Sequence, residues 1–211
     1  MKSLGIFGTS GFAREVNDIA SELGYRTVYI CRDQAELEGR SSPGDAMLER
    51  DVGRYGDMQF AIGIGENAVR QKVARRFCKE LRFVNLIHPS ASFGRGQRDV
   101  ICASKGVIVC AGVRFTNNIQ VGDFTIFNLN ATIGHDAILD DFVNVSPGAN
   151  ISGNVHIGTR CWLGTGAALN QGKGGAKLII GADTVIGSGS VVVKECEANA
   201  VYVGNPARRI K

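Results

Sequence analysis

Residues 107–169 decide the fold and divide into groups of six: VIVCAG VRFTNN IQVGDF TIFNLN ATIGHD AILDDF VNVSPG ANISGN VHIGTR CWLGTG AAL. The first residue of each group is mostly small, and the third is a larger apolar residue. This pattern holds for eleven consecutive groups, from Val107 to Leu169. It returns in register at Leu178, after a five-residue insertion at 173–177.

A fixed period of six residues is typical of a parallel β-helix, in which three short strands and their turns make one triangular coil. Positions one and three lie two apart in a strand, so both side chains point inward. Stability then comes from the stacking of neighbouring coils. A β-sandwich would need turns of varying length and would not keep one register. The pattern resembles the left-handed parallel β-helix, an exception to the right-handed crossover rule.

The first ninety residues follow a different pattern. Strands are expected at 2–7, 27–31, 60–65 and 83–87. A helical stretch is expected after the turn at residues 8–13 and up to Leu23, a second helix at 66–81, and a loop with one short helix at 33–58. Val69, Val73 and Phe77 form the apolar face of the second helix. Strands that alternate with helices predict a small parallel, Rossmann-like α/β sheet. We therefore expect two domains, residues 1–90 and residues 91–211.

Composition narrows the classes of function. The net charge is only +4, and no basic run is interleaved with aromatic residues, so a nucleic-acid surface is not expected. The six cysteines show no metal-binding spacing with the three histidines, so no metal is expected. We found no signal peptide and no apolar run long enough to span a membrane. Scattered free thiols favour the cytoplasm.

Two segments have residues suited to binding or catalysis. The turn Gly8–Ala13 lies between a strand and a helix, where backbone N–H groups favour a phosphate, although the same turn can mark only tight packing. The strand ends at Asp33 and Gly63 would line the same crevice. His135 is followed by Asp136 at a coil corner, where it can act as a general base or be an incidental surface histidine. His88 is expected to be structural, and His156 to face solvent.

The insertion 173–177 and the basic end of the chain each have two interpretations. Either segment could meet anionic phosphates, or could simply be solvated; for the insertion we favour the second. Residues 204–211 are expected to end the prism.

Taken together, these motifs resemble a known family, the sialic acid O-acetyltransferases and bacillosamine-type N-acetyltransferases that use a left-handed β-helix. The resemblance covers the whole chain. Its elements are the Gly8–Ala13 turn, residues 61–63 (AIG), residues 85–91 (NLIHPSA), Asn128 with residues 134–136 (GHD), and residues 204–208 (GNPAR).

The resemblance implies a homotrimer, with acetyl-CoA bound between adjacent prisms and a nucleotide-linked amino sugar bound by the first domain. It implies catalytic roles for His135 as base, Asp136 as its acidic partner and Asn128 near the acceptor amine. It implies substrate contacts at Ser10, Gly11, Phe12, Asp33 and Gly63, and acetyl-CoA contacts at Asn144, Gly153, Thr165 and Ser188. Asn144 stands where the family has a second histidine, and Arg32 replaces the first member of an acidic pair.

The leading hypothesis is therefore acetyl-CoA-dependent N-acetylation of a nucleotide-linked amino sugar for surface glycan synthesis, with direct transfer and no acyl-enzyme. O-acetylation of a sialic-acid-like sugar would use the same base. A non-catalytic nucleotide-sensing or assembly subunit is the alternative from another class.

Overall fold

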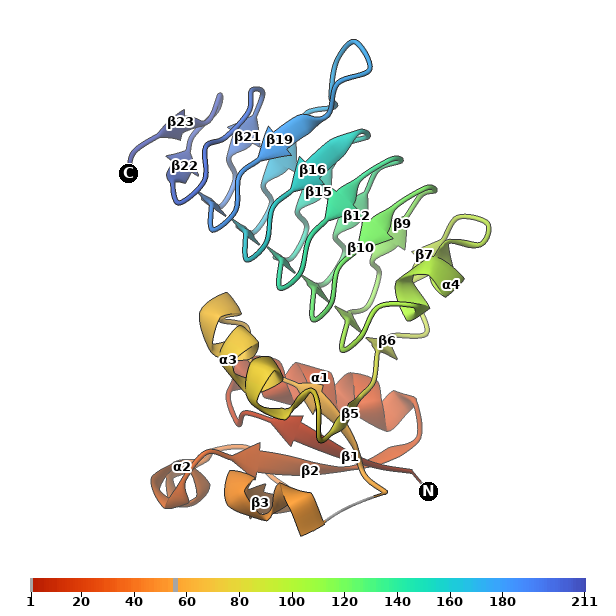
Figure 1. Cartoon of the computed structure of the whole chain (residues 1–211), viewed down its shortest axis with the longest axis vertical. Helices are drawn as coiled ribbons and strands as arrows, with labels where there is room; N and C mark the ends of the chain where they lie inside the picture. Colours follow the sequence, from red (N-terminus) through yellow and green to blue (C-terminus); the bar gives the residue numbers. More distant parts are fainter. Residues whose placement is uncertain (1, 55–56) are drawn as a thin grey trace.

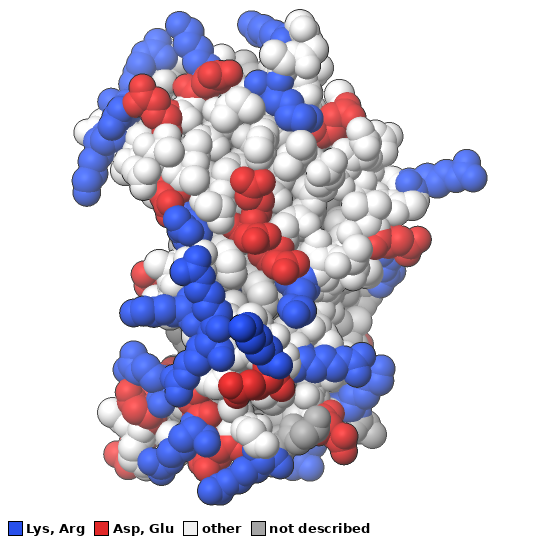
Figure 2. Space-filling model, in the orientation of Figure 1, with Lys and Arg blue, Asp and Glu red and all other residues white. Residues whose placement is uncertain are grey.

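The computed structural model describes residues 2–54 and 57–211. A small α/β domain lies at one end of a long three-sided prism, with helices α1 and α3 between its sheet and the prism (Figure 1). Acidic and basic side chains are interspersed on the face seen in Figure 2, in keeping with the small net charge. No helix among the described residues is long and apolar enough to cross a membrane.

The α/β domain has a five-stranded sheet of order β3-β2-β1-β4-β5, in which all pairs are parallel. Its elements are β1 (Lys2–Phe7), α1 (Gly11–Glu22), β2 (Tyr25–Cys31), α2 (Gln34–Gly39), β3 (Ala46–Leu48), the 3-10 helix η1 (Glu49–Arg54), β4 (Gln59–Ile62), α3 (Asn67–Phe77) and β5 (Arg82–Phe83). The parallel α/β sheet is as predicted. The predicted loop at 33–58 was too simple, because it contains α2, β3 and η1; its residues 55–56 lie outside the described residues.

The prism consists of three parallel sheets, one on each face. The eight-stranded sheet contains β6 (Leu86–Ile87), β8 (Ile108–Val109), β11 (Ile126–Phe127), β14 (Asn144–Val145), β17 (Trp162–Leu163), β20 (Val185–Ile186), β22 (Val201–Val203) and the antiparallel β23 (Arg208–Arg209). The six-stranded sheet contains β7 (Ser92–Phe93), β9 (Arg114–Phe115), β12 (Thr132–Ile133), β15 (Asn150–Ile151), β18 (Ala168–Leu169) and β21 (Val191–Val192). The four-stranded sheet contains β10 (Gln120–Val121), β13 (Ile138–Leu139), β16 (Val155–Ile157) and β19 (Leu178–Ile180), while helix α4 (Gln97–Cys102) lies near the start of the prism.

Strand pairing confirms the period of six. Each strand pairs with the strand one coil later, as Ile126 does with Asn144. Across the insertion the spacing grows by five residues, and Val155 pairs with Leu178. The first and third positions of every group from Val107 to Leu169 are buried, so they form the core of the prism.

The prism turns at its three edges through residues with positive φ. One edge, between the eight- and six-stranded sheets, contains Gly112, Asn130, Gly148, Gly166 and Gly189; a second, between the six- and four-stranded sheets, contains Asn118, Asp136 and Asn154; the third contains Gly106, Phe124, Phe142, Arg160 and Asp183. We name these the 112–189 edge, the 118–154 edge and the 106–183 edge. Side chains beside these corners point away from the core, so an edge can present reactive groups.

The predicted strand at 83–87 is split between the two parts of the molecule. Arg82–Phe83 ends the α/β sheet as β5, and Leu86–Ile87 opens the eight-stranded sheet as β6. Hydrogen bonding typical of the prism therefore begins before residue 90, and the division of function at residues 90/91 stays a prediction.

A buried arginine joins the two parts. Arg70 of α3 is 1% exposed, and its guanidinium donates to the backbone oxygens of Gly65 (2.7 Å), Phe124 (2.9 Å) and Phe142 (2.8 Å). Burial lowers the pKa of Arg70 to about 9, which leaves it protonated at neutral pH. The predicted apolar face of α3 is therefore wrong in part. Val69 is 37% exposed, and Asn67, Arg70, Ala74 and Phe77 are the buried residues.

Candidate functional site

The 118–154 edge holds an imidazole–carboxylate pair. After β12 the chain turns through Gly134, His135 and Asp136, and Asp136 adopts a φ of 60°. His135 Nδ1 lies 2.7 Å from Asp136 Oδ2, and both side chains are about half exposed. A carboxylate only accepts hydrogen bonds, so Nδ1 carries the proton. Neutral His135 therefore has its lone pair on Nε2, the arrangement that a general base requires.

Three groups hold Asp136. His135 and the side-chain amide of Asn118 both donate to its carboxylate, and Lys177 Nζ donates to its backbone oxygen at 2.6 Å. The hydrogen bond from His135 and then that from Asn118 lower the pKa of Asp136, with smaller help from the charges of His135 and Lys177. The carboxylate thus stays ionised beside the imidazole and stabilises the imidazolium once a proton is taken up.

Gly153 lies one coil after His135, directly against the imidazole. A Cβ at position 153 would come within 2.4 Å of His135 Nε2 and 2.5 Å of Cε1. The ring can therefore pack on this coil only because residue 153 has no side chain. The backbone N–H of Gly153 has no acceptor among the described residues.

Asn128 and Asn144 do not join His135 within one chain. Both are buried on the eight-stranded sheet, where Asn128 Nδ2 donates to Asn144 Oδ1 at 3.0 Å. Asn144 Nδ2 in turn donates to the backbone oxygen of Gly65 at 3.0 Å, across the junction with the α/β domain. In this chain the two amides thus tie the prism to the turn after β4.

Thr165 and Ser188 are exposed on successive coils of the 112–189 edge. The two coils are joined there by a hydrogen bond from the backbone N–H of Gly189 to the oxygen of Thr165 (2.9 Å). Of the residues expected to contact acetyl-CoA, Gly153 therefore lies on the 118–154 edge, Thr165 and Ser188 lie on the 112–189 edge, and Asn144 lies on the eight-stranded sheet.

The α/β domain contains a crevice at the carboxyl ends of β1, β2 and β4, with a volume of about 240 Å³. Ser10 lines it, and its side chain makes no capping bond to α1. Of the other predicted substrate contacts, Gly11 is the first residue of α1 and Phe12 packs partly buried against the core of this domain. Neither residue lines the crevice.

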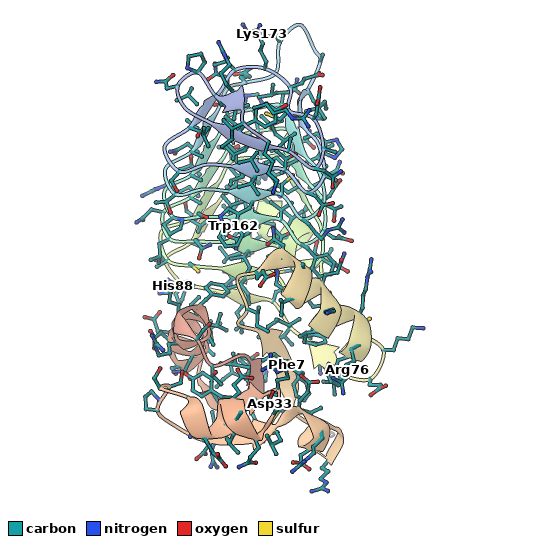
Figure 3. The ribbon with its side chains drawn as sticks, turned by 90° about the vertical axis from the view of Figure 1, so that its left-hand side faces the viewer. Phe7, Asp33, Arg76, His88, Trp162 and Lys173 are labelled. Carbon is teal, nitrogen blue, oxygen red and sulfur yellow. The ribbon has the colours of Figure 1, made fainter. Side chains whose placement is uncertain are left out.

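Asp33 and Gly63 have structural partners. The carboxylate of Asp33 caps α2 by accepting from the N–H of Glu36 (2.9 Å), and it also pairs with Arg32 (2.8 Å). A Cβ on Gly63 would lie 2.7 Å from the Cα of Ala13, so this glycine is required for close packing of β4 on α1. Figure 3 shows Asp33 in the α/β domain, remote from the loop that holds Lys173.

The crevice contains two acidic residues, Glu36 and Glu49, that sequence reasoning missed. Glu36 accepts from Thr9 Oγ1 and from the N–H of Arg32, both at 2.8 Å, and Arg32 and Glu49 also line the cavity. The spacing of Asp33 and Glu36 is that of a capping box, in which the third residue after the cap reaches back towards the turn. That signal could have located Glu36.

The other two histidines have partners of their own. His156 Nε2 lies 3.0 Å from Asp140 on the four-stranded sheet, where it is partly exposed. His88 Nε2 lies 3.0 Å from Glu22 of α1, and its Nδ1 accepts from the N–H of Ser90, in agreement with a structural role. No group of three or more possible metal ligands occurs in residues 2–54 and 57–211.

Comparison with known proteins agrees with this architecture. The family model for the PglD N-terminal domain matches residues 3–77. A GDP-perosamine N-acetyltransferase from Escherichia coli O157:H7 is 29% identical over 220 aligned residues, which cover 100% of this chain and 97% of the relative.

Solved structures match over both parts of the chain. PerB from Caulobacter crescentus, in complex with CoA and GDP-perosamine, superposes with a TM-score of 0.85 at 28% identity and covers 100% of this chain and 98% of its own. The acetyltransferase domain of PglB from Neisseria gonorrhoeae FA1090, in complex with acetyl coenzyme A, superposes with a TM-score of 0.84 at 26% identity over 99% of both chains.

Proposed function

Because the chain belongs to the hexapeptide-repeat sugar N-acetyltransferases, we propose that it transfers the acetyl group of acetyl-CoA to the amino group of a nucleotide-linked sugar. The expected left-handed β-helix and the expected acyltransferase class are both confirmed. The relatives act on or bind GDP-perosamine, which favours a nucleotide-linked amino sugar over a sialic-acid-like hydroxyl acceptor. We place the reaction in surface glycan synthesis and in the cytoplasm, where six free thiols would stay reduced.

The observation that supports this proposal most is the His135–Asp136 pair over Gly153. An ammonium group has no lone pair, so a base must take its proton for the nitrogen to attack the thioester carbon. Nε2 of His135 takes that proton, and Asp136 stabilises the resulting imidazolium. The C–N bond forms, the C–S bond breaks, and CoA leaves as its thiol after regaining a proton. The N–H of Gly153, which has no acceptor among the described residues, would donate to the oxyanion.

The crevice of the α/β domain would take the nucleotide. Its rim is the amino end of α1, where backbone N–H groups favour phosphate, and the hydroxyl of Ser10 is free of a capping bond. The carboxylate of Glu36 can accept hydrogen bonds from a ribose or base. These features support binding of a nucleoside diphosphate group, which would position the sugar amine.

We propose a homotrimer with active sites between subunits. Within one prism, His135 and Gly153 lie on the 118–154 edge, whereas Thr165 and Ser188 lie on the 112–189 edge and Asn128 lies on the adjoining eight-stranded sheet. A neighbouring prism would bring the two edges together, and closed threefold symmetry would supply three equivalent sites.

Two measurements test the proposed reaction. Incubation with acetyl-CoA and either GDP-perosamine or a UDP-linked amino sugar should release CoA thiol and consume the free amine of the sugar. Thiol release with a retained amine would refute N-transfer. His135→Ala should abolish the release, and a fully active His135→Ala protein would refute the assigned base.

Mixing of inactive variants tests the shared site. Co-expressed His135→Ala and Asn128→Ala chains should recover about a quarter of wild-type activity, because random trimers pair an intact His135 with an intact neighbouring Asn128 at about one site in four. If each site belonged to a single chain, the mixture would stay inactive.

A further inference from the structure

The five-residue insertion places a lysine in line with the catalytic pair. Because Val155 pairs with Leu178, position 177 corresponds to Asn154, one coil earlier, and to Asp136, two coils earlier. The side chain of Lys177 therefore continues the 118–154 edge. The insertion itself projects from the prism, and Figure 3 shows Lys173 on this loop.

Lys177 reaches back along the edge to the residue beside the base. Its Nζ donates to the backbone oxygen of Asp136 at 2.6 Å and to Oδ1 of Asn154 at 3.1 Å. The ammonium thus contacts Asn154, one coil earlier, and also Asp136, two coils earlier. Among the described residues it is the one cationic side chain, besides His135 itself, that faces Asp136.

Asp136 lies at a corner of the prism, with a φ of 60° in the left-handed region, as Asn118 and Asn154 do at the equivalent corners of the same edge. In this conformation its carboxylate lies 2.7 Å from Nδ1 of His135. A charged donor on the Asp136 oxygen restrains the backbone that carries this carboxylate.

The two ends of the inserted loop are held to the prism by hydrogen bonds that do not involve the Lys177 ammonium. Gly172 N donates to the oxygen of Gly153 at 3.2 Å where the loop leaves, and Asn154 Nδ2 donates to the oxygen of Ala176 at 2.9 Å where it returns. Leu178 N also donates to the oxygen of Asn154 at 3.1 Å. The contact of Lys177 with Asp136 is additional to these bonds.

We propose that Lys177 is a positioning residue for acetyl transfer: its ammonium holds the Asp136 backbone, so that Asp136 keeps His135 in the orientation and tautomer of a base. This inference rests on the proposed function. It gives the inserted segment a role in the reaction, in place of the solvated excursion that sequence alone favoured.

Lys177→Met tests the proposal, because it removes the charge and the donor while it keeps a flexible apolar stem. We expect kcat to fall about tenfold, since small displacements of a catalytic group are costly, with both KM values within about twofold of wild type. The pKa of Asp136, followed by carboxyl carbon NMR, should rise, because the charge of Lys177 is one of the causes that lower it. Lys177→Arg should restore most of kcat.

Lys173→Met is the matched control, since it lies in the same loop and makes no side-chain hydrogen bond within residues 2–54 and 57–211. In this variant kcat and the pKa of Asp136 should stay at their wild-type values. A folded Lys177→Met protein with unchanged kcat and an unchanged pKa of Asp136, or one altered only in thermal stability or in the KM for acetyl-CoA, would overturn the proposal. Absence of acetyl transfer by the wild-type chain would instead overturn the proposed function.

Discussion

Replacement of Gly153 by alanine perturbs the site at the contact between two coils. Gly153 has an ordinary φ, so alanine adds no backbone strain. Its Cβ would lie 2.4 Å from Nε2, 2.5 Å from Cε1 and 2.8 Å from Cδ2 of His135. Ordinary contacts begin at about 3.4 Å. The imidazole must therefore move by about 1 Å, because repulsion rises steeply inside van der Waals contact.

A movement of this size has a large kinetic effect and a small structural one. A misplacement of about 1 Å costs roughly 100-fold in rate, and a general base as a whole contributes about 10² to 10⁴. We therefore expect kcat to fall about 100-fold, measured as release of CoA thiol. The His135 ring is half exposed and can swing into solvent, so the thermal midpoint should change by no more than about 2 °C.

Gly53→Ala is the control, because a Cβ there meets nothing within 4 Å among the residues that the structure describes, and the backbone φ is ordinary. It should retain full activity. A Gly153→Ala protein with kcat within about threefold of wild type would refute the assignment of His135 as the base in this orientation. A loss equal to that of His135→Ala would show that the displaced ring no longer acts.

Two further predictions concern the joint between the domains and the acidic partner of the base. Arg70→Met leaves two buried prism carbonyls without donors, which costs about 1–3 kcal/mol each, so the thermal midpoint should fall by roughly 4 °C or more. Arg75→Met, at an exposed position of the same helix, should change the midpoint little. A midpoint within about 2 °C of wild type would contradict the role of Arg70 as a joint. Asn118→Ala should raise the pKa of Asp136, followed by carboxyl carbon NMR, because a hydrogen bond to the charged form is lost. The pKa of Asp136 in the native protein lies below the ordinary 3.8, so the hydrogen bond from Asn118 contributes stability at higher pH, and this stability disappears as the pH falls through the lowered pKa. An unchanged titration of Asp136 in Asn118→Ala would contradict the hydrogen bond from Asn118.

The prism could be predicted in detail because its signal is local and repeated. Each coil buries the same two positions of a group, so Val107 and Leu169 obey one rule although they are far apart in the chain. The joint with the α/β domain gave no such signal. Arg70 binds backbone oxygens of Phe124 and Phe142, and any residue type supplies a backbone oxygen. An arginine on a basic helix is therefore expected to be solvated until its tertiary partners are known.

The candidate site could be predicted only where its residues are neighbours in sequence or in register. His135 and Asp136 are adjacent, and Gly153 follows one coil later, so the period alone brings them together. The crevice was harder: Asp33 caps α2 and its contact with substrate stays a prediction, while Glu36, which lines the cavity, was not foreseen. The capping-box spacing identifies Glu36 only if a helix is known to begin after Asp33, and the weakly periodic segment 33–58 did not show where its helix begins.

The stacking of the coils explains how one corner of a regular prism can hold the candidate site. On the 118–154 edge, equivalent positions of successive coils hold Asn118, Asp136, Asn154 and Lys177, and each projects outward at the same corner. Asn118, on the coil before His135, donates to Asp136. Gly153, on the coil after it, leaves space for the imidazole, and Lys177, on the next coil, supplies the ammonium. Because the backbone spacing of the coils is fixed by their strand pairs, the site is held by the prism core and not by loops. A change of one side chain on this edge therefore alters the position or charge of the base while the core beneath it stays intact.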